Sequence, residues 1–210
     1  MKKTTMKSLL SLMAVTAMAT ISPALAQAGK VAASDPKFDT IESPMVGGNT
    51  GRKNWKPKEW LEAEVKFKVE MPKSYKQHFV DEVTVRWFVA VDNPKGKGYV
   101  LLEKEVTHVN VPVGEEVYSS VYLSPSAIKR ITGKDRASKG AISHIGGEIS
   151  VNGTSVDGDK GRYFTSKGKI GWWTSGKLSR YDAIPLLNKN ETPFAFLWWD
   201  RYAEIRNERR

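Results

Sequence analysis

The sequence predicts an all-β protein, an immunoglobulin-like β-sandwich with one short helix. Several segments of the 210-residue chain alternate apolar and polar side chains, which is the period of a strand with one buried face. The connections between these segments are short and contain Gly, Pro, Asn and Lys, as in antiparallel hairpins. A single segment has both the start and the stop signal of a helix.

The first 26 residues have the pattern of a secretory signal peptide. A basic start, MKKTTMK, precedes an apolar run from about Leu9 to Ile21, and Ala24-Leu25-Ala26 gives the cleavage pattern before Gln27. The apolar run is shorter than the roughly 20 residues of a bilayer-spanning helix, although an uncleaved anchor is the alternative. We therefore expect an exported protein, located in the periplasm or at the outer membrane and cell surface.

Composition indicates one domain with a basic surface. Removing residues 1–26 leaves 184 residues and takes away three lysines and no acid, so the formal net charge falls from +10 to +7. The basic excess suits an acidic partner such as an anionic glycan or lipid headgroups, yet alternation of Glu and Lys over 62–70 suits a solvated strand face equally. No nucleic-acid-binding motif occurs. The chain has no cysteine, so its stability must come from packing.

The strands are predicted in order along the chain. Residues 27–54 lack periodicity and predict a flexible N-terminal arm, or one packed at the periphery, before a folded domain at 55–210. WLEAEVKFKVEM at 60–71 and FVDEVTVRWFVAVD at 79–92 alternate strongly, and GYVLLEKEVTHVNV and EEVYSSVYL follow. Four consecutive strands with short turns favour antiparallel pairing.

The second half is predicted to contain the helix and the aromatic strands. Ser124 is an N-cap, Pro125 opens the helix and Gly133 ends it. AISHIGGEISVNG predicts a strand followed by a tight Asn-Gly turn. RYFTSKGKIGWW and FAFLWWDRYAEI predict two or three further strands; FAFLWWD would be apolar on both faces and would need cover on both.

Two pairs of adjacent tryptophans, at 172–173 and 198–199, are the most conspicuous candidate contacts. Neighbours on a strand point to opposite faces, so at most one tryptophan of each pair would be free. A core position, a protein interface and a carbohydrate platform remain the three alternatives. The candidate contact residues are Trp173 and Trp199, with the basic neighbours Lys177 and Arg180.

A glycine-rich loop at 152–161 carries possible calcium ligands. Asn152, Asp157 and Asp159 alternate there, but the EF-hand pattern is not met, so an acidic hairpin tip is the preferred interpretation.

Apart from the weak calcium pattern of that loop, the sequence contains no motif of a catalytic or metal site. The histidines are far apart and in no metal-binding motif: His78, His108 and His144. No G-x-S-x-G motif occurs, and the paired carboxylates are adjacent rather than opposed. We therefore expect no catalytic residue, no cofactor and no metal, and a protein that is not an enzyme.

Several segments resemble a known family. The leader ending ALAQAG, the stretch FDTIESPMVGGNTGRKNWKPKEWLEAEVKFKV, and VTVRWFVAV followed by YVLLEKEV resemble pilus-like proteins of mucin-dwelling Verrucomicrobia of the Akkermansia type, encoded beside type IV pilus assembly genes. The resemblance implies an immunoglobulin-like sandwich, exposure at the outer membrane or in the periplasm, and a role in pilus assembly or host contact. It implies no catalytic residues.

One departure from type IV pilins bears on the role. A pilin keeps a long apolar helix after its processing site, whereas QAGKVAASDPK follows the predicted cleavage here. We therefore expect an accessory or adhesive component rather than the main filament subunit. Pilus or envelope proteins are the expected partners, with host glycans and peripheral association with the outer membrane left open, and no nucleic acid. The alternative is a module that binds mucin glycans; a periplasmic hydrolase ranks third.

Overall fold

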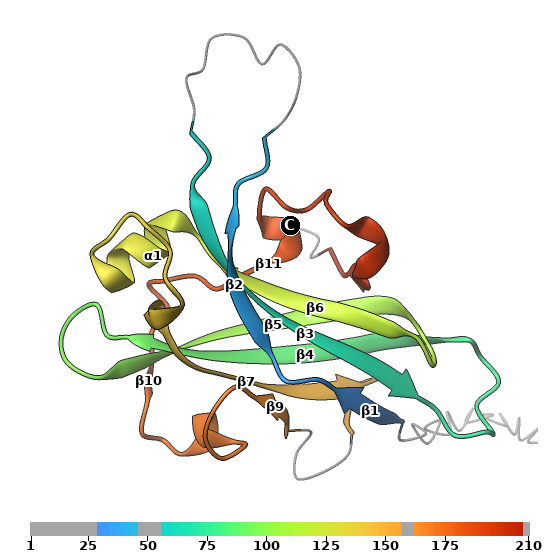
Figure 1. The fold of residues 1–210 in the computed structure, drawn as a ribbon. Helices are drawn as coiled ribbons and strands as arrows, with labels where there is room; N and C mark the ends of the chain where they lie inside the picture. Colours follow the sequence, from blue (N-terminus) through green and yellow to red (C-terminus); the bar gives the residue numbers. More distant parts are fainter. Residues whose placement is uncertain (1–28, 46–55, 157–161, 208–210) are drawn as a thin grey trace, which may run out of the picture.

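The computed structural model describes residues 29–45, 56–156 and 162–207 and shows a sandwich of two β-sheets (Figure 1). Sheet A contains β1 (Lys30–Ala33), β2 (Lys37–Glu42), β3 (Glu59–Glu70), β6 (Glu116–Leu123) and β11 (Leu187–Asn188). Sheet B contains β4 (Phe79–Asp92), β5 (Tyr99–Pro112), β7 (Ile142–Val151), β8 (Thr154–Ser155), β9 (Arg162–Thr165), β10 (Ser179–Arg180) and β12 (Glu204–Ile205). The predicted all-β sandwich fold is confirmed. The predicted leader lies outside the described residues.

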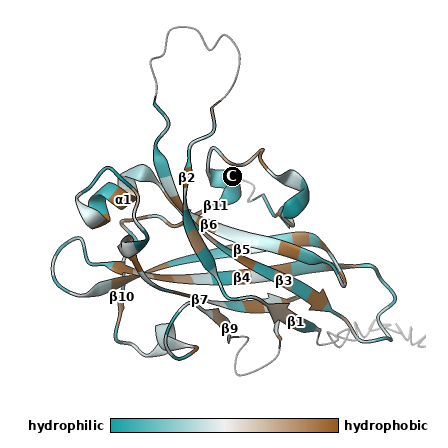
Figure 2. Ribbon diagram, in the orientation of Figure 1, coloured by the Kyte–Doolittle hydropathy of each residue, from teal (hydrophilic) through white to brown (hydrophobic). Residues whose placement is uncertain are grey.

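The core lies between the sheets and follows the predicted alternation. Along β3 the odd-numbered side chains from Leu61 to Val69 are all buried, and the even-numbered ones are partly exposed. Figure 2 shows the same alternation of hydrophobic and hydrophilic residues along the long strands. Trp87 of β4 is fully buried, and its Nε1 donates a hydrogen bond to Ser119 Oγ at 3.2 Å. No helix in the described ranges is long and apolar enough to cross a bilayer.

The main strand pairs are antiparallel, but they do not follow chain order. β3 pairs with β6, whereas β4 pairs with β5 on one side and β7 on the other. The connection at 71–78 therefore crosses from sheet A to sheet B instead of forming a hairpin. Such crossing between sheets is typical of immunoglobulin-like sandwiches.

Of the two alternatives for the N-terminal arm, a flexible one is wrong for the residues that the structure describes, because they form strands of sheet A. β1 pairs with residues 67–70 of β3, and β2 pairs with residues 59–64 of the same strand. Val31 of β1 is buried in the core. The two strands are short and separated by Pro36, so they have little periodicity of their own, and the long edge of β3 supplies their hydrogen bonds.

The predicted helix is confirmed as α1 (Pro125–Thr132). The Ser124 side chain accepts a hydrogen bond from the Ala127 N–H, and Gly133 ends the helix with φ of 71°, a left-handed conformation that suits glycine. The predicted turn after β7 also forms, with Asn152 and Gly153 both at positive φ before β8.

The two tryptophan pairs are not on strands, and this prediction is wrong. Trp172 and Trp173 lie in the 3-10 helix η3 (Trp172–Thr174), because Gly168 and Gly171 take positive φ and turn the chain. Residues 193–198 form turns that lead into η5 (Trp199–Arg201). A run that is apolar at nearly every position has no hydrophobic period. Its sequence therefore does not distinguish a strand from a series of packed turns.

Candidate functional site

The C-terminal aromatic segment, residues 189–205, covers the outer face of sheet A and then reaches sheet B (Figure 1). It begins with η4 (Lys189–Glu191), which follows a capping box. Asn188 Oδ1 accepts from the Glu191 N–H at 3.2 Å, and Glu191 Oε2 accepts from the Asn188 N–H at 2.7 Å. This reciprocal cap fixes the direction in which the segment leaves β11.

Phe194 anchors the segment on sheet A. Its ring is fully buried, stacks on Tyr122 at 5.3 Å between ring centroids, and meets Trp60 edge-on at 5.7 Å. Trp60 is itself fixed by a hydrogen bond from Nε1 to Ser43 Oγ. Three interlocking aromatic rings hold the middle of the segment in place, which limits how far its neighbours can collapse onto the surface.

His108 anchors the other end. The side chain comes from β5 and is fully buried, and its Nδ1 lies 3.1 Å from the carbonyl oxygen of Ala203, so the ring donates from Nδ1. Within the described residues, Nε2 has no hydrogen-bond partner. Burial lowers the pKa of His108 to about 4. β12 then pairs with β5 at His108, so the segment closes the side of the sandwich between β6 and β5.

Tyrosine hydroxyls and two glutamates form a network beneath the segment. The Tyr122 hydroxyl donates to Glu62 Oε1 at 2.6 Å, and the Tyr202 hydroxyl lies between Glu62 and Glu64. Arg201 forms an ion pair with Glu64 and lies over the Tyr118 ring. Burial raises the pKa of the Glu62 carboxyl, and the hydrogen bond from Tyr122 opposes this only in part.

Three large aromatic side chains remain exposed on the same segment. Phe196 is 88% exposed, Trp199 61% and Trp198 50%. Trp198 has φ of 51° and ψ of 43°, the left-handed region in which a bulky side chain is strained. Its ring lies nearly parallel to Phe194, with 6.4 Å between centroids.

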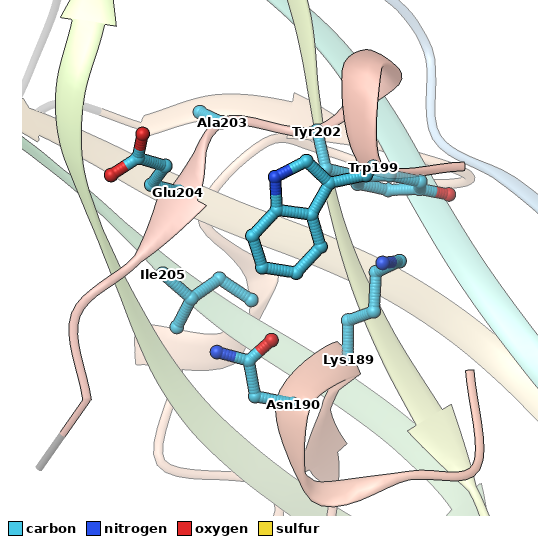
Figure 3. Close-up of a pocket in the computed structure, with 7 residues that line it drawn as sticks. All are labelled: Lys189, Asn190, Trp199, Tyr202, Ala203, Glu204 and Ile205. Atoms are coloured by element: carbon cyan, nitrogen blue, oxygen red, sulfur yellow. The ribbon is translucent and has the colours of Figure 1, made fainter. Parts of the chain in front are cut away.

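Trp199 lies above a small hollow, which is also lined by Lys189 and Tyr202 (Figure 3). The Lys189 ammonium is buried, donates to the Ala195 carbonyl at 3.1 Å, and lies 5.7 Å from the Trp199 ring centroid and 5.0 Å from that of Tyr202. Burial lowers the pKa of Lys189. The hollow measures about 20 Å³, room for about one water molecule, so it supports the indole rather than enclosing a ligand.

The four predicted contact residues are not brought together. Trp173, Lys177 and Arg180 belong to the segment on sheet B, drawn in orange in Figure 1, and Trp199 belongs to the red C-terminal segment. Arg180 pairs with Glu103 and Asp182, and Lys177 is exposed.

Trp173 is a structural residue rather than a contact. It is 7% exposed, stacks on Phe88 at 5.1 Å with an angle of 11°, and donates from Nε1 to Glu148 Oε1 at 2.8 Å. Gly146 lies directly beneath its ring. Trp172 is partly exposed, and its Nε1 donates to Thr165 Oγ1 at 3.1 Å. The expectation of at most one free tryptophan in each pair is wrong for the second pair, in which both rings are exposed.

The other candidates stay separate as well. His78 is exposed, His144 contacts Ser143 and Trp172, and His108 is buried, so the three histidines do not converge. Within the described residues, no group of three or more His, Asp or Glu side chains is placed to hold a metal. Asn152 uses its side-chain oxygen to accept from the Glu82 N–H, and Asp157 and Asp159 lie outside the described residues.

Sequence reasoning missed the residues that make this surface. Glu62 and Glu64 look like part of a solvated strand face, and Phe196 and Trp198 look like strand residues. The available signal was Pro193 immediately before the aromatic run, because proline is rare inside a sheet.

Comparisons with known proteins establish the relationship. A family model matches residues 22–209. The crystal structure of a protein from Akkermansia muciniphila is similar to this chain with a TM-score of 0.76 and 37% sequence identity, covering 86% of this chain and 95% of that one. No curated protein matches the chain. With that match over nearly the whole domain, the chain belongs to the family of pilus-associated, immunoglobulin-like proteins of the Akkermansia type.

Proposed function

We propose that the protein is a non-enzymatic, exported accessory component of the pilus system that acts by binding pilus or envelope proteins. Family membership supports the association with pili, and the leader-like residues 1–26 support export to the periplasm or cell surface. The absence of an opposed carboxylate pair or nucleophile motif in the sequence supports a binding role over catalysis.

The observation that carries this proposal is the exposure of Phe196 and Trp199 on a rigidly anchored segment. Aromatic side chains are enriched at the energetic centres of protein interfaces. Phe194 on one side and His108 on the other fix the segment, so its exposed rings lose little conformational freedom on binding. A partner with a complementary apolar recess would bury both rings.

Site-specific photo-crosslinking tests the proposal. A benzophenone amino acid replaces Phe196 in the full chain, in cells that produce the pilus apparatus, and the products are identified by mass spectrometry. Tyr99 is the matched control, because it is an aromatic residue of sheet B that is 50% exposed. We expect a pilus or envelope protein to be captured from position 196 and not from position 99.

Substitution then measures the contribution of the rings. Phe196→Ala combined with Trp199→Ala should weaken the captured complex at least about 30-fold, the effect of losing a single interface hot spot of about 2 kcal/mol. Identical products from positions 196 and 99, or a complex unaffected by the double substitution, would show that this surface is not the contact.

A further inference from the structure

A polar groove lies on the outer face of sheet A, between β2 and the C-terminal aromatic segment. Two hollows of about 440 and 190 Å³ form it, and they share Glu62 and Glu64 of β3 as their floor. The larger hollow alone falls within the range of about 300–1,000 Å³ that small-molecule sites occupy. Phe196, the most exposed aromatic residue of the C-terminal aromatic segment, does not line the groove.

The charges that line the groove are balanced. Asp39 of β2 pairs with Lys139 at 3.3 Å, and Glu64 pairs with Arg201. Glu62 and Lys37 complete the set, so carboxylates and cations are equal in number among the lining residues. A charged ligand would gain little net attraction here, whereas an uncharged ligand with both donors and acceptors would find partners for both.

One carboxylate oxygen in the floor is available to a ligand. Glu62 Oε1 accepts from the Tyr122 hydroxyl and lies 3.2 Å from the Tyr202 hydroxyl, whose one hydrogen is shared with Glu64, but Glu62 Oε2 forms no hydrogen bond with any described residue. The Glu62 side chain is half-buried, and this burial raises the pKa of its carboxyl. A ligand hydroxyl that donates to Oε2 would supply a charge-assisted hydrogen bond in a partly dry site.

Trp198 provides an apolar wall. One face of its ring packs near Phe194, and the residue is half exposed beside the glutamates. Trp198 has a left-handed backbone and lines the groove, whereas the next residue, Trp199, lines the separate small hollow of Figure 3. A flat, half-exposed aromatic ring beside hydrogen-bonding groups matches a ligand with one apolar face and a polar edge.

From this balance of charges, the free Glu62 oxygen and the Trp198 wall, we propose that the groove binds an uncharged saccharide unit. The C–H face of a sugar ring would stack on Trp198, and its hydroxyls would donate to Glu62 and accept from Lys139 or Lys37. Neither Phe196 nor Trp199, the rings proposed to bind a partner protein, lines this groove, so the two proposals can be tested independently.

Saturation-transfer-difference NMR on the purified intact chain provides the test, with maltose, lactose, cellobiose and N,N′-diacetylchitobiose as separate probes. We expect saturable binding of at least one probe, with a dissociation constant in about the millimolar range. Trp198→Gly removes the ring and tolerates the left-handed backbone, and it should weaken binding at least about tenfold. Glu62→Gln keeps the acceptor for the tyrosines and should weaken binding severalfold through loss of the charge.

Trp199→Ala is the matched control, because it removes the other tryptophan of the pair and leaves the groove intact. Circular dichroism shows whether each variant is folded. If Trp198→Gly does not fold, the effect of Glu62→Gln on sugar binding provides the test. Three results would overturn the proposal: no saturable binding of any of the four sugars, binding unchanged in both groove variants, or an equal loss in Trp199→Ala. Binding of a charged peptide in place of the sugars would likewise overturn it.

Discussion

Acidification should destabilise this protein through His108, the buried residue that joins β5 to the C-terminal aromatic segment. The neutral ring donates from Nδ1 to the Ala203 carbonyl, faces the Phe67 ring at 5.9 Å, and leaves Nε2 without a partner among the described residues. Protonation would place a charge on a side chain that is 0% exposed. The folded state therefore resists the proton that the unfolded chain accepts readily.

The magnitude follows from the two pKa values. An unfolded histidine titrates near 6.5, and burial lowers the pKa of His108 to about 4 in the folded protein. Between these values the unfolded state binds more protons, so the free energy of unfolding rises with pH across this window and is flat on either side as far as His108 is concerned. A difference of about 2.5 pKa units corresponds to about 3 kcal/mol.

Urea unfolding at a series of pH values from 3.5 to 7.5, run in parallel on the wild type and His108→Phe, isolates this contribution. The variant loses the hydrogen bond to Ala203, which costs about 1–3 kcal/mol near neutral pH. It should nevertheless lose about 3 kcal/mol less than the wild type on going to pH 4. Parallel pH curves for the two proteins would refute the reasoning, because the carboxylates common to both would then explain all of the acid sensitivity.

Three substitutions test the packing of the aromatic segments. Gly146→Ala would place a Cβ 2.2 Å from Trp173 Cζ3, so it should cost about 1–3 kcal/mol in urea unfolding and increase quenching of Trp173; an unchanged midpoint would mean that the ring is mobile. Phe194→Ala should lower the free energy of unfolding by about 3–5 kcal/mol and make residues 189–205 sensitive to limited proteolysis. If these residues stay resistant to the protease, Phe194 does not anchor the segment. Phe196→Ala should change stability by less than about 0.5 kcal/mol in the same assay, and a larger loss would show that this ring is packed.

The sandwich and its helix were predictable because their signals are local. The side chains of β3 and β4 that face the central core repeat every second residue, and this period is visible in the sequence even though Phe88 and Ala90 of β4 are also buried on the other face. Ser124 and Gly133 mark the ends of α1 through hydrogen bonds and backbone angles confined to a few neighbouring residues. Such features need no knowledge of the rest of the chain.

The surface was not predictable because it depends on contacts between residues far apart in the sequence. Glu62 alternates with core residues whether its face is open to water or covered, and the cover comes from Tyr202, 140 positions away. β1 and β2 likewise form because β3 is long enough to pair with both. Gly146 explains how a bulky Trp173 can lie flat on sheet B, but the sequence does not indicate which ring it receives.

Trp198 gives a direct test of whether this surface is held in a strained conformation. At an ordinary helical position alanine is more stable than glycine by about 1 kcal/mol, whereas a left-handed conformation costs a residue with a Cβ about 1–2 kcal/mol that glycine avoids. Trp198 has φ of 51° and ψ of 43°, so Trp198→Gly should be more stable than Trp198→Ala by up to about 1 kcal/mol, although both lose the packing of the ring. Urea unfolding of the two variants measures this difference in the free energy of unfolding. Both variants lack the indole ring, so the loss of its packing is the same in each and cancels in the comparison. The ordinary order, with alanine the more stable, would mean that the segment relaxes out of the left-handed conformation and that nothing in the fold holds the indole over Glu62 and Glu64.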